Sequence, residues 1–167
     1  MPRFWRRRNF IGSAPRLGDG PFGPRRALTL AVTSYLIDAP FDKALDAVRH
    51  ALTSVGLSIS GEMDIADRIR RQLGLGLGGC RVLLVDSPYL LVEALALDRS
   101  AAALLPLHVV VSGRGAATHV QWVNLAHMRQ AGLPVSAEAP LAKLQSELLR
   151  ALDTVGHKET GWPVYTA

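Results

Sequence analysis

The stretch that decides the fold is residues 80–124, which read CRVLLVDSPYLLVEALALDRSAAALLPLHVVVSGRGAATHVQWVN. Its segment 81–85, which is apolar from Val82 on, predicts a buried strand, because a short apolar run bounded by turn residues is typical of one. Ser87 and Pro88 then predict the start of a helix that runs to about residue 97, since serine is a favoured N-cap and proline fits the first helical turn.

The second half of this stretch predicts a β-hairpin. Segments 104–112 and 116–124 flank Gly113-Arg114-Gly115, and glycine supplies the backbone conformation that a tight turn needs. A two-residue turn at either Gly113-Arg114 or Arg114-Gly115 places odd positions of one strand opposite even positions of the other. One face of the hairpin is then apolar and carries Leu107, Val109, Val111, Val120 and Trp122. The opposite face carries His108, Ser112, His119 and Gln121.

Hydrophobic periodicity predicts the elements on either side. Segments 27–37 and 57–63 alternate apolar and polar residues like half-buried strands, whereas 40–56 and 138–155 have the three-and-four spacing of amphipathic helices. Asp64 is expected to cap a further short helix. Its inward-facing residues are predicted to be Ile65, Ile69 and Leu73.

Five strands, two long helices and two short ones predict an α+β fold, in which helices cover one face of a mostly antiparallel sheet. The other face is partly polar, so we expect it to be open or covered by another subunit. Three parts are expected: a basic, disordered leader over 1–26, one domain over 27–156 and a tail over 157–167. No segment approaches the roughly 18–20 apolar residues of a membrane-spanning helix, which predicts a soluble protein.

The positive charge of the chain is concentrated in the leader. Of 19 basic and 14 acidic residues, segment 1–26 holds seven arginines and one acid, so the remainder is close to neutral. Three interpretations stay open: a solvated leader, weak sequence-independent attraction to nucleic acid or an anionic surface, and an export signal. The attraction would act through Arg3, Arg6, Arg7 and Arg8. The export signal is disfavoured because the Arg-Arg pair is not followed by an apolar segment of about 7–15 residues.

Cys80 is the only cysteine, so the chain can form neither an internal disulfide nor a cysteine-based metal site. A lone thiol fits a reducing compartment, and we expect a cytoplasmic protein.

Four segments, taken in order, carry a family resemblance. They are the helix 41–56 ending in glycine, the corner Glu62-Met63-Asp64-Ile65, the strand and Pro88 turn over 82–90, and Leu104-Leu105-Pro106-Leu107-His108-Val109-Val110-Val111. In these features the chain resembles the family called domain of unknown function 302. The resemblance implies a β-α-β4-α sandwich like one repeat of the TATA-box-binding-protein fold, and a homodimer. It implies no activity, because the family has no settled one.

The chain departs from that family at one turn. Many members have Cys-Asn-Pro after the third strand, where this chain has Asp86-Ser87-Pro88. Cys80 lies before that strand and does not replace the family cysteine. Thiol chemistry is therefore not carried over to this chain.

Two pairs of residues are candidates for a ligand site. With a Gly113-Arg114 turn, His108 and His119 lie directly opposite, about 5 Å apart at Cβ, where two imidazoles could hold a metal if a third ligand such as His127 came near. Asp86 and Ser87 stand at a helix N-terminus, where backbone N–H groups can bind a small polar ligand. Ordinary sheet-surface polarity and helix capping are the competing explanations.

A third motif is set aside. Gly74, Gly76 and Gly79 match the spacing of a dinucleotide fingerprint, but they follow a helix and enter a strand, the reverse of the order that phosphate binding requires. A loose connector is the better explanation.

We therefore predict a homodimeric ligand-binding or accessory protein, with no catalytic residue, metal or cofactor assigned. The alternative is a metal-dependent or redox-linked enzyme that uses the His108/His119 and Asp86/Ser87 region. A third hypothesis is nucleic-acid association through the leader.

Overall fold

The structure, a computed structural model, describes residues 32–125 and 136–159. Six strands form one antiparallel sheet in the order β2-β3-β4-β5-β1-β6. The strands are β1 Val32–Ile37, β2 Ser58–Asp64, β3 Cys80–Asp86, β4 Leu107–Arg114, β5 Ala117–Val123 and β6 His157–Lys158. The helices are α1 Phe41–Ser54, α2 Ile65–Leu73, α3 Pro88–Leu97, the 3-10 helix η1 Arg99–Leu104 and α5 Glu138–Leu152.

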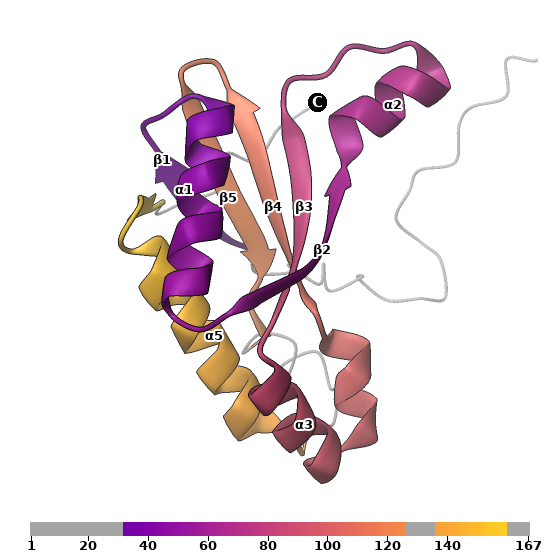
Figure 1. Cartoon of the computed structure of the whole chain (residues 1–167), viewed down its shortest axis with the longest axis vertical. Coiled ribbons are helices and arrows are strands. Elements are labelled where there is room, and N and C mark those ends of the chain that lie inside the picture. The colour runs from indigo at the N-terminus through magenta and orange to yellow at the C-terminus, as the bar shows by residue number, and fades with distance from the viewer. Residues whose placement is uncertain (1–31, 126–135, 160–167) are drawn as a thin grey trace, which may run out of the picture.

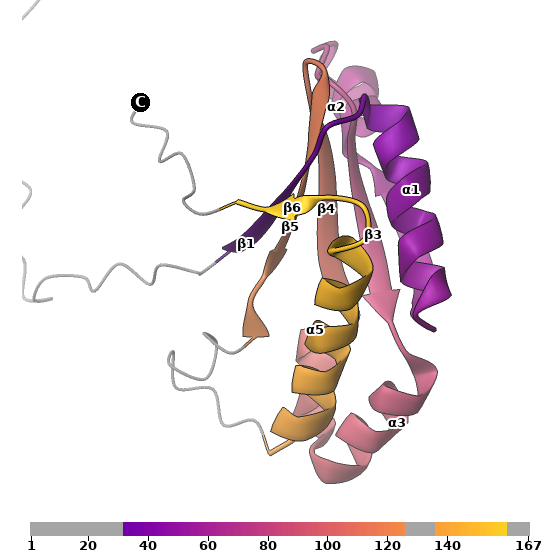
Figure 2. The same ribbon diagram turned by 90° about the vertical axis from the view of Figure 1, so that its left-hand side faces the viewer.

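Helices α1 and α5 lie on the same side of the sheet, as the two views show (Figures 1 and 2). The core between these layers is apolar and includes Val48, Leu52, Leu83, Val109, Leu144 and Leu148, each at most 1% exposed. This arrangement confirms the predicted α+β fold with helices on one face. The leader and His127 fall outside the described residues.

The hairpin has the predicted faces but a different turn. Leu107, Val109, Val111, Val120 and Trp122 are all buried, which confirms the alternation. The strands run on to Arg114 and Ala117, so the turn is Gly115-Ala116 and neither predicted turn forms. Gly115 has φ +64°, a left-handed conformation that glycine adopts without strain. The observed register differs from the predicted ones by whole residue pairs. Each side chain therefore lies on its predicted face but opposite a different partner.

A bulge divides β2. The pairing with β3 shifts between Ile59 and Gly61, so Ile59 pairs with Val85 of the core while Met63 pairs with Val82 on the opposite face. A bulge adds one residue to one strand and reverses the facing of all that follow. The alternation predicted for 57–63 would put Ile59 and Met63 on one face of the strand. That prediction is wrong because of the bulge, and Met63 is 43% exposed.

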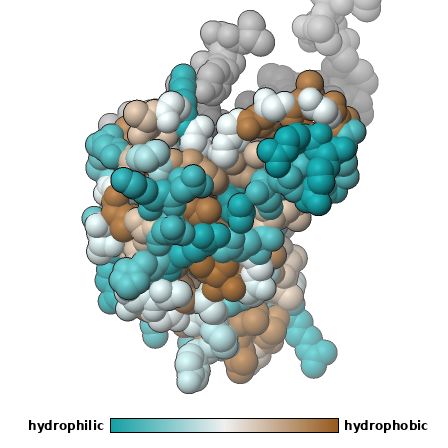
Figure 3. All heavy atoms as spheres, turned by 45° about the horizontal axis from the view of Figure 1, so that its top comes forward, coloured by the Kyte–Doolittle hydropathy of each residue, from teal (hydrophilic) through white to brown (hydrophobic). Residues whose placement is uncertain are grey.

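Helix α2 begins where expected, with the Asp64 carboxylate accepting a hydrogen bond of 2.8 Å from the Asp67 N–H. However, no residue of α2 is buried, because the helix projects beyond the layers formed by α1 and the sheet (Figure 1). Leu73, predicted to face inward, is 67% exposed. Figure 3 shows apolar residues bordering the hydrophilic lobe at upper right, where α2 projects.

The sheet continues two residues into the segment assigned to the tail. His157 and Lys158 of β6 pair with Leu36 and Tyr35 of β1, and the Glu159 N–H donates to the Ser34 carbonyl at 2.9 Å. No helix among the described residues is long and apolar enough to cross a membrane.

Candidate functional site

The two histidines of the predicted pair are not neighbours. His119 lies opposite Ser112, and His108 is four residues further along β4, a separation of about 13 Å along the strand. The prediction of a close pair is wrong, because it depended on a turn at Gly113-Arg114. Within the ranges 32–125 and 136–159, no three His, Cys, Asp or Glu side chains are grouped so that they could hold a metal ion.

His119 instead belongs to a polar cluster on the sheet face opposite the helices. Its Nδ1 lies 3.0 Å from Oε2 of Glu159, and the Ser34 hydroxyl donates to that same oxygen at 2.6 Å. The side chains of His119 and Glu159 are 16% and 22% exposed. These two hydrogen bonds, the Ser34 bond first, outweigh partial burial and hold the pKa of Glu159 below its ordinary value.

This cluster has the residue types of a hydrolase triad but not its connectivity. A serine nucleophile passes its proton to a base that accepts a hydrogen bond from its hydroxyl. Here the Ser34 hydroxyl donates to Glu159, whose lowered pKa makes it a weak base. These hydrogen bonds therefore connect the segment after β6 to β1 and β5, and they do not activate Ser34 as a nucleophile.

Sequence reasoning missed Ser34 and Glu159. Glu159 lies 125 residues from Ser34 and 40 from His119, in a segment too short to show a strand period. Only the pairing of β6 with β1 brings the three side chains together.

The Asp86-Ser87 corner holds its polar groups differently from the prediction. The Ser58 hydroxyl donates to Oδ1 of Asp86 at 2.7 Å. Ser87 occupies the N-cap position of α3 and is buried, yet its side chain makes no capping hydrogen bond. The prediction that the Ser87 hydroxyl caps the helix is therefore wrong. Leu84, two residues before Asp86 on the same face of β3, pairs with His108. The structure therefore brings Asp86 and His108 to one end of the sheet without His119.

The glycine-rich connector shows no phosphate-binding geometry. Gly74 ends α2 in a left-handed conformation with φ +68°. Gly79 enters β3 and packs so closely on Phe41 that a Cβ there would lie under 3.0 Å from the ring. The connector thus follows a helix and enters a strand, as predicted.

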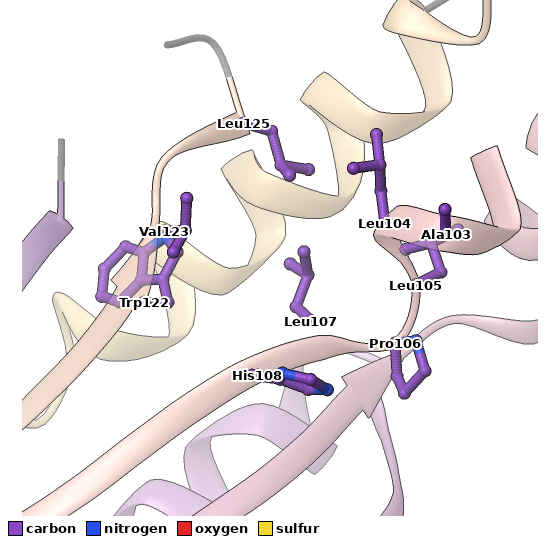
Figure 4. A pocket seen from close by; sticks show the side chains of 9 residues that line it. All are labelled: Ala103, Leu104, Leu105, Pro106, Leu107, His108, Trp122, Val123 and Leu125. Carbon is purple, nitrogen blue, oxygen red and sulfur yellow. The ribbon is translucent and has the colours of Figure 1, made fainter. Parts of the chain in front are cut away.

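A cavity of about 340 Å³ opens at the end of the sheet where β4 begins and β5 ends. Apolar side chains from η1, both strands and the following loop surround it (Figure 4). Its lining comprises Ala103, Leu104, Leu105, Pro106, Leu107, His108, Trp122, Val123 and Leu125. Of the four residues proposed from the sequence, His108 is the one in this lining. The lining contains no lysine, arginine or carboxylate, so the cavity suits an uncharged molecule.

Trp122, one of the lining residues, carries a polar atom that is itself buried. The residue is 3% exposed, and its Nε1 is buried without a hydrogen-bond partner. Its ring packs against that of Tyr35, with centroids 5.7 Å apart and planes inclined by 32°. Sequence reasoning placed Trp122 in the core, and the unpaired N–H was not foreseeable from the alternation that placed it there.

Cys80 is half-buried at the start of β3, opposite Ser112. Burial, and then the nearby Asp64 carboxylate, raise the pKa of the Cys80 thiol above its ordinary value. Because the thiolate is the nucleophile, this environment does not make Cys80 reactive.

Comparison with known families agrees with this fold. The model of the domain of unknown function DUF302 matches residues 33–155, which span β1 to the end of α5. The chain belongs to the DUF302 family. The resemblance noted from the sequence is thereby confirmed.

A solved structure described as the uncharacterized conserved protein DUF302 from Bacillus stearothermophilus is similar to this DUF302 protein. The two share 15% sequence identity with a TM-score of 0.66, and the match covers 74% of this chain and 97% of the other. At that identity the likeness shows the fold alone. A search of curated proteins gives no match. The likeness to the TATA-box-binding-protein fold stays a prediction.

Proposed function

We propose that this DUF302 protein is a homodimer that binds a small apolar ligand in the cavity between η1 and the β4–β5 strand ends, and that it acts as a binding or accessory protein. The cavity carries this proposal. Its volume of about 340 Å³ lies within the roughly 300–1,000 Å³ of ligand pockets, and its lining is mostly aliphatic, as in such pockets.

Binding is favoured over catalysis by the hydrogen bonds of the sheet's polar groups. The Ser34 hydroxyl donates to the Glu159 carboxylate, so Ser34 is not activated as a nucleophile, and the Asp86 carboxylate already accepts a hydrogen bond from Ser58. The enzymatic alternative would rest on Asp86 and His108 at the cavity end of the sheet. Its signature would be turnover that His108→Ala abolishes.

Exposed apolar surface supports a dimer. The end of α2 and its connector expose Leu73, Leu75 and Leu77 at 67%, 58% and 53%. Contiguous exposed apolar side chains on a projecting element commonly mark a protein–protein contact. A second copy is the partner that our proposal assigns to them.

Location and charge complete the proposal. We assign the protein to the cytoplasm, where the lone Cys80 would stay reduced. We also assign weak, salt-sensitive attraction for nucleic acid or anionic surfaces to the arginines of the leader. Deleting residues 1–26 should abolish that attraction. Binding that survives the deletion would place the basic surface elsewhere.

Ligand binding is tested with a neutral apolar dye, N-phenyl-1-naphthylamine, titrated into the full chain. Ala103→Phe adds a ring to the cavity lining, whereas Ala102→Phe adds the same ring at an exposed neighbour in η1 that does not line the cavity. We expect Ala103→Phe to weaken dye binding at least tenfold and Ala102→Phe to leave it unchanged. Equal binding by both variants would contradict the proposed site.

The dimer is tested by light scattering. The chain has a mass of 18.0 kDa, so the prediction is a particle of twice that mass. Leu75→Glu should shift the equilibrium toward the monomer because it places a charge in the contact. A monomeric parent at tens of micromolar would refute the dimer without affecting the ligand site.

A further inference from the structure

We infer that the ligand of the cavity is an amphiphilic amine, whose apolar body fills the cavity while its ammonium group stays at the mouth beside Asp86 and His108. This inference rests on the proposed function, since it specifies the chemistry of the molecule that the same cavity binds. It depends on two accessible polar side chains and on the charges around them.

The two polar side chains stand where the lining meets the open face of the sheet. His108 belongs to the lining and is exposed, and in Figure 4 its ring lies beside Pro106, away from Leu125. Its partner across the strands is Leu84, two residues before Asp86 on the same face of β3. Asp86 and His108 are therefore diagonal neighbours, about 7–8 Å apart. Asp86 is half-buried, so water and a ligand head group can reach both side chains.

The charges at this end of the sheet favour a cation. The N-terminus of α3 acts as about half a positive charge, so the full negative charge of the preceding Asp86 outweighs it. Helices α3 and η1, with the N-cap of η1, add two acids and one base, and with Asp86 the sum is −2. These further residues are Glu93, Asp98 and Arg99.

A protonated amine also matches the hydrogen-bonding groups at the mouth. The Ser58 hydroxyl donates to Oδ1 of Asp86 at 2.7 Å, and among the described residues nothing donates to Oδ2. An ammonium group has three N–H donors and no acceptor, so it can donate to Oδ2. A neutral imidazole at His108 offers one further accepting nitrogen. A carboxylate head group would instead meet Asp86 as a like charge, and the lining has no lysine or arginine to compensate it.

The cavity itself receives only the apolar body of such a ligand. The eight lining residues other than His108 are apolar, so a charge drawn in among them would lose its water without replacement. At the mouth the ammonium keeps its contact with water. The volume of about 340 Å³ is roughly twice that of a 150 Å³ cavity that holds benzene, which leaves room for an eight-carbon chain.

The test compares three probes that share an eight-carbon chain and differ in the charge of the head group: octylamine, 1-octanol and octanoate. Each is titrated, below the concentration at which it forms micelles, against N-phenyl-1-naphthylamine bound to the full chain. The measurements are made at pH 8, where an alkylamine is protonated.

Two variants of matched charge accompany the parent. Asp86→Asn removes the carboxylate charge and keeps the shape of the side chain. Asp42→Asn removes the charge of an exposed carboxylate in the first turn of α1. Asp42 lies at the other end of the sheet, since the adjacent Phe41 packs against Gly79 at the start of β3.

For the parent we expect octylamine to displace the dye at a concentration between about fivefold and thirtyfold lower than octanoate. This range follows when a unit charge about 4–8 Å away in water attracts one head group and repels the other. In Asp86→Asn the two probes should differ by at most about threefold, whereas Asp42→Asn should keep the ratio of the parent. That ratio should also shrink as NaCl is raised from roughly 0.05 M to roughly 0.5 M.

The outcomes separate this inference from the proposed function. If 1-octanol displaces the dye but octylamine is no better than octanoate, the cavity binds apolar molecules and the amine assignment is wrong. A ratio that Asp86→Asn leaves unchanged would refute the assignment as well. If none of the three probes displaces the dye, the inference and the proposed cavity both fail. Should Asp86→Asn not fold, the parent still decides, because a ratio that salt does not reduce would contradict an electrostatic preference.

Discussion

Replacing Glu159 by glutamine should destabilise the protein by an amount that depends on pH. The carboxylate accepts two hydrogen bonds at one oxygen, 2.6 Å from the Ser34 hydroxyl and 3.0 Å from Nδ1 of His119. Glutamine keeps an acceptor of the same shape but loses the charge, and charge-assisted hydrogen bonds are about twice as strong as neutral ones. Weakening both bonds should therefore lower the free energy of unfolding by about 1–2 kcal/mol. This loss is smaller than for fully buried charged groups, because both side chains are partly exposed.

The pH dependence follows from the lowered pKa of Glu159. A carboxyl whose pKa is lower in the folded state binds fewer protons there than in the unfolded chain. Its stabilisation is fully present above the ordinary value of 4.5 and is lost as the pH falls through the folded-state pKa. The difference between parent and Glu159→Gln should be largest near pH 7 and shrink progressively below about pH 4.5.

Thermal and urea unfolding across this pH range measure the effect. A difference of 1–2 kcal/mol corresponds to a decrease in Tm of about 2–8 °C at pH 7. Glu93→Gln is the matched control, because Glu93 is an exposed carboxylate on α3, away from this cluster. A Glu159→Gln protein as stable as the parent at pH 7, or a difference that persists undiminished at low pH, would refute this account of the cluster.

Three further predictions concern packing, a buried hydroxyl and the thiol. Gly79→Ala should lower the free energy of unfolding by about 1–3 kcal/mol, because the new Cβ would overlap the ring of Phe41. The control Gly76→Ala has open space around its Cβ and should be neutral or slightly stabilising. Equal effects of the two substitutions in urea unfolding would contradict the close contact with Phe41. Burial, followed by the neighbouring Asp153 carboxylate, raises the pKa of Tyr35 to about 12. The free energy of unfolding of the parent should therefore fall between about pH 10 and 12, and Tyr35→Phe should remove that loss. Identical stability profiles of the two proteins over this pH range would contradict the raised pKa. Because burial raises the pKa of Cys80, iodoacetamide should modify it more slowly at pH 8 in the folded protein than in urea, and similar rates would show an accessible thiolate.

The fold was readable from the sequence wherever burial imposed a period. Leu107, Val109 and Val111 lie at alternate positions of one strand, as do Val120 and Trp122 of the next. That spacing determines which side chains face the helices whatever the turn. The position of the turn was not determined in the same way, because Gly113 and Gly115 both permit one. The structure places Gly115 in the left-handed conformation, and the separation of His108 from His119 follows.

The candidate site depended on contacts that leave no local pattern. The bulge after Ile59 reverses the facing of Met63, and a single inserted residue is invisible to a search for alternation. The amphipathic pattern of α2 predicted an inward-facing apolar side, but such a pattern does not show whether another element of the fold packs against that side. Ser34 and Glu159 meet only through strand pairing across 125 residues, and the unpaired nitrogen of Trp122 depends on the arrangement of side chains around a cavity.

A crystal structure of the full chain with N-phenyl-1-naphthylamine would test the central claim most directly, because it locates the ligand. We predict electron density for the dye between η1 and the ends of β4 and β5. Density on the exposed leucines of α2 or on the open face of the sheet, with the cavity empty, would contradict the proposal.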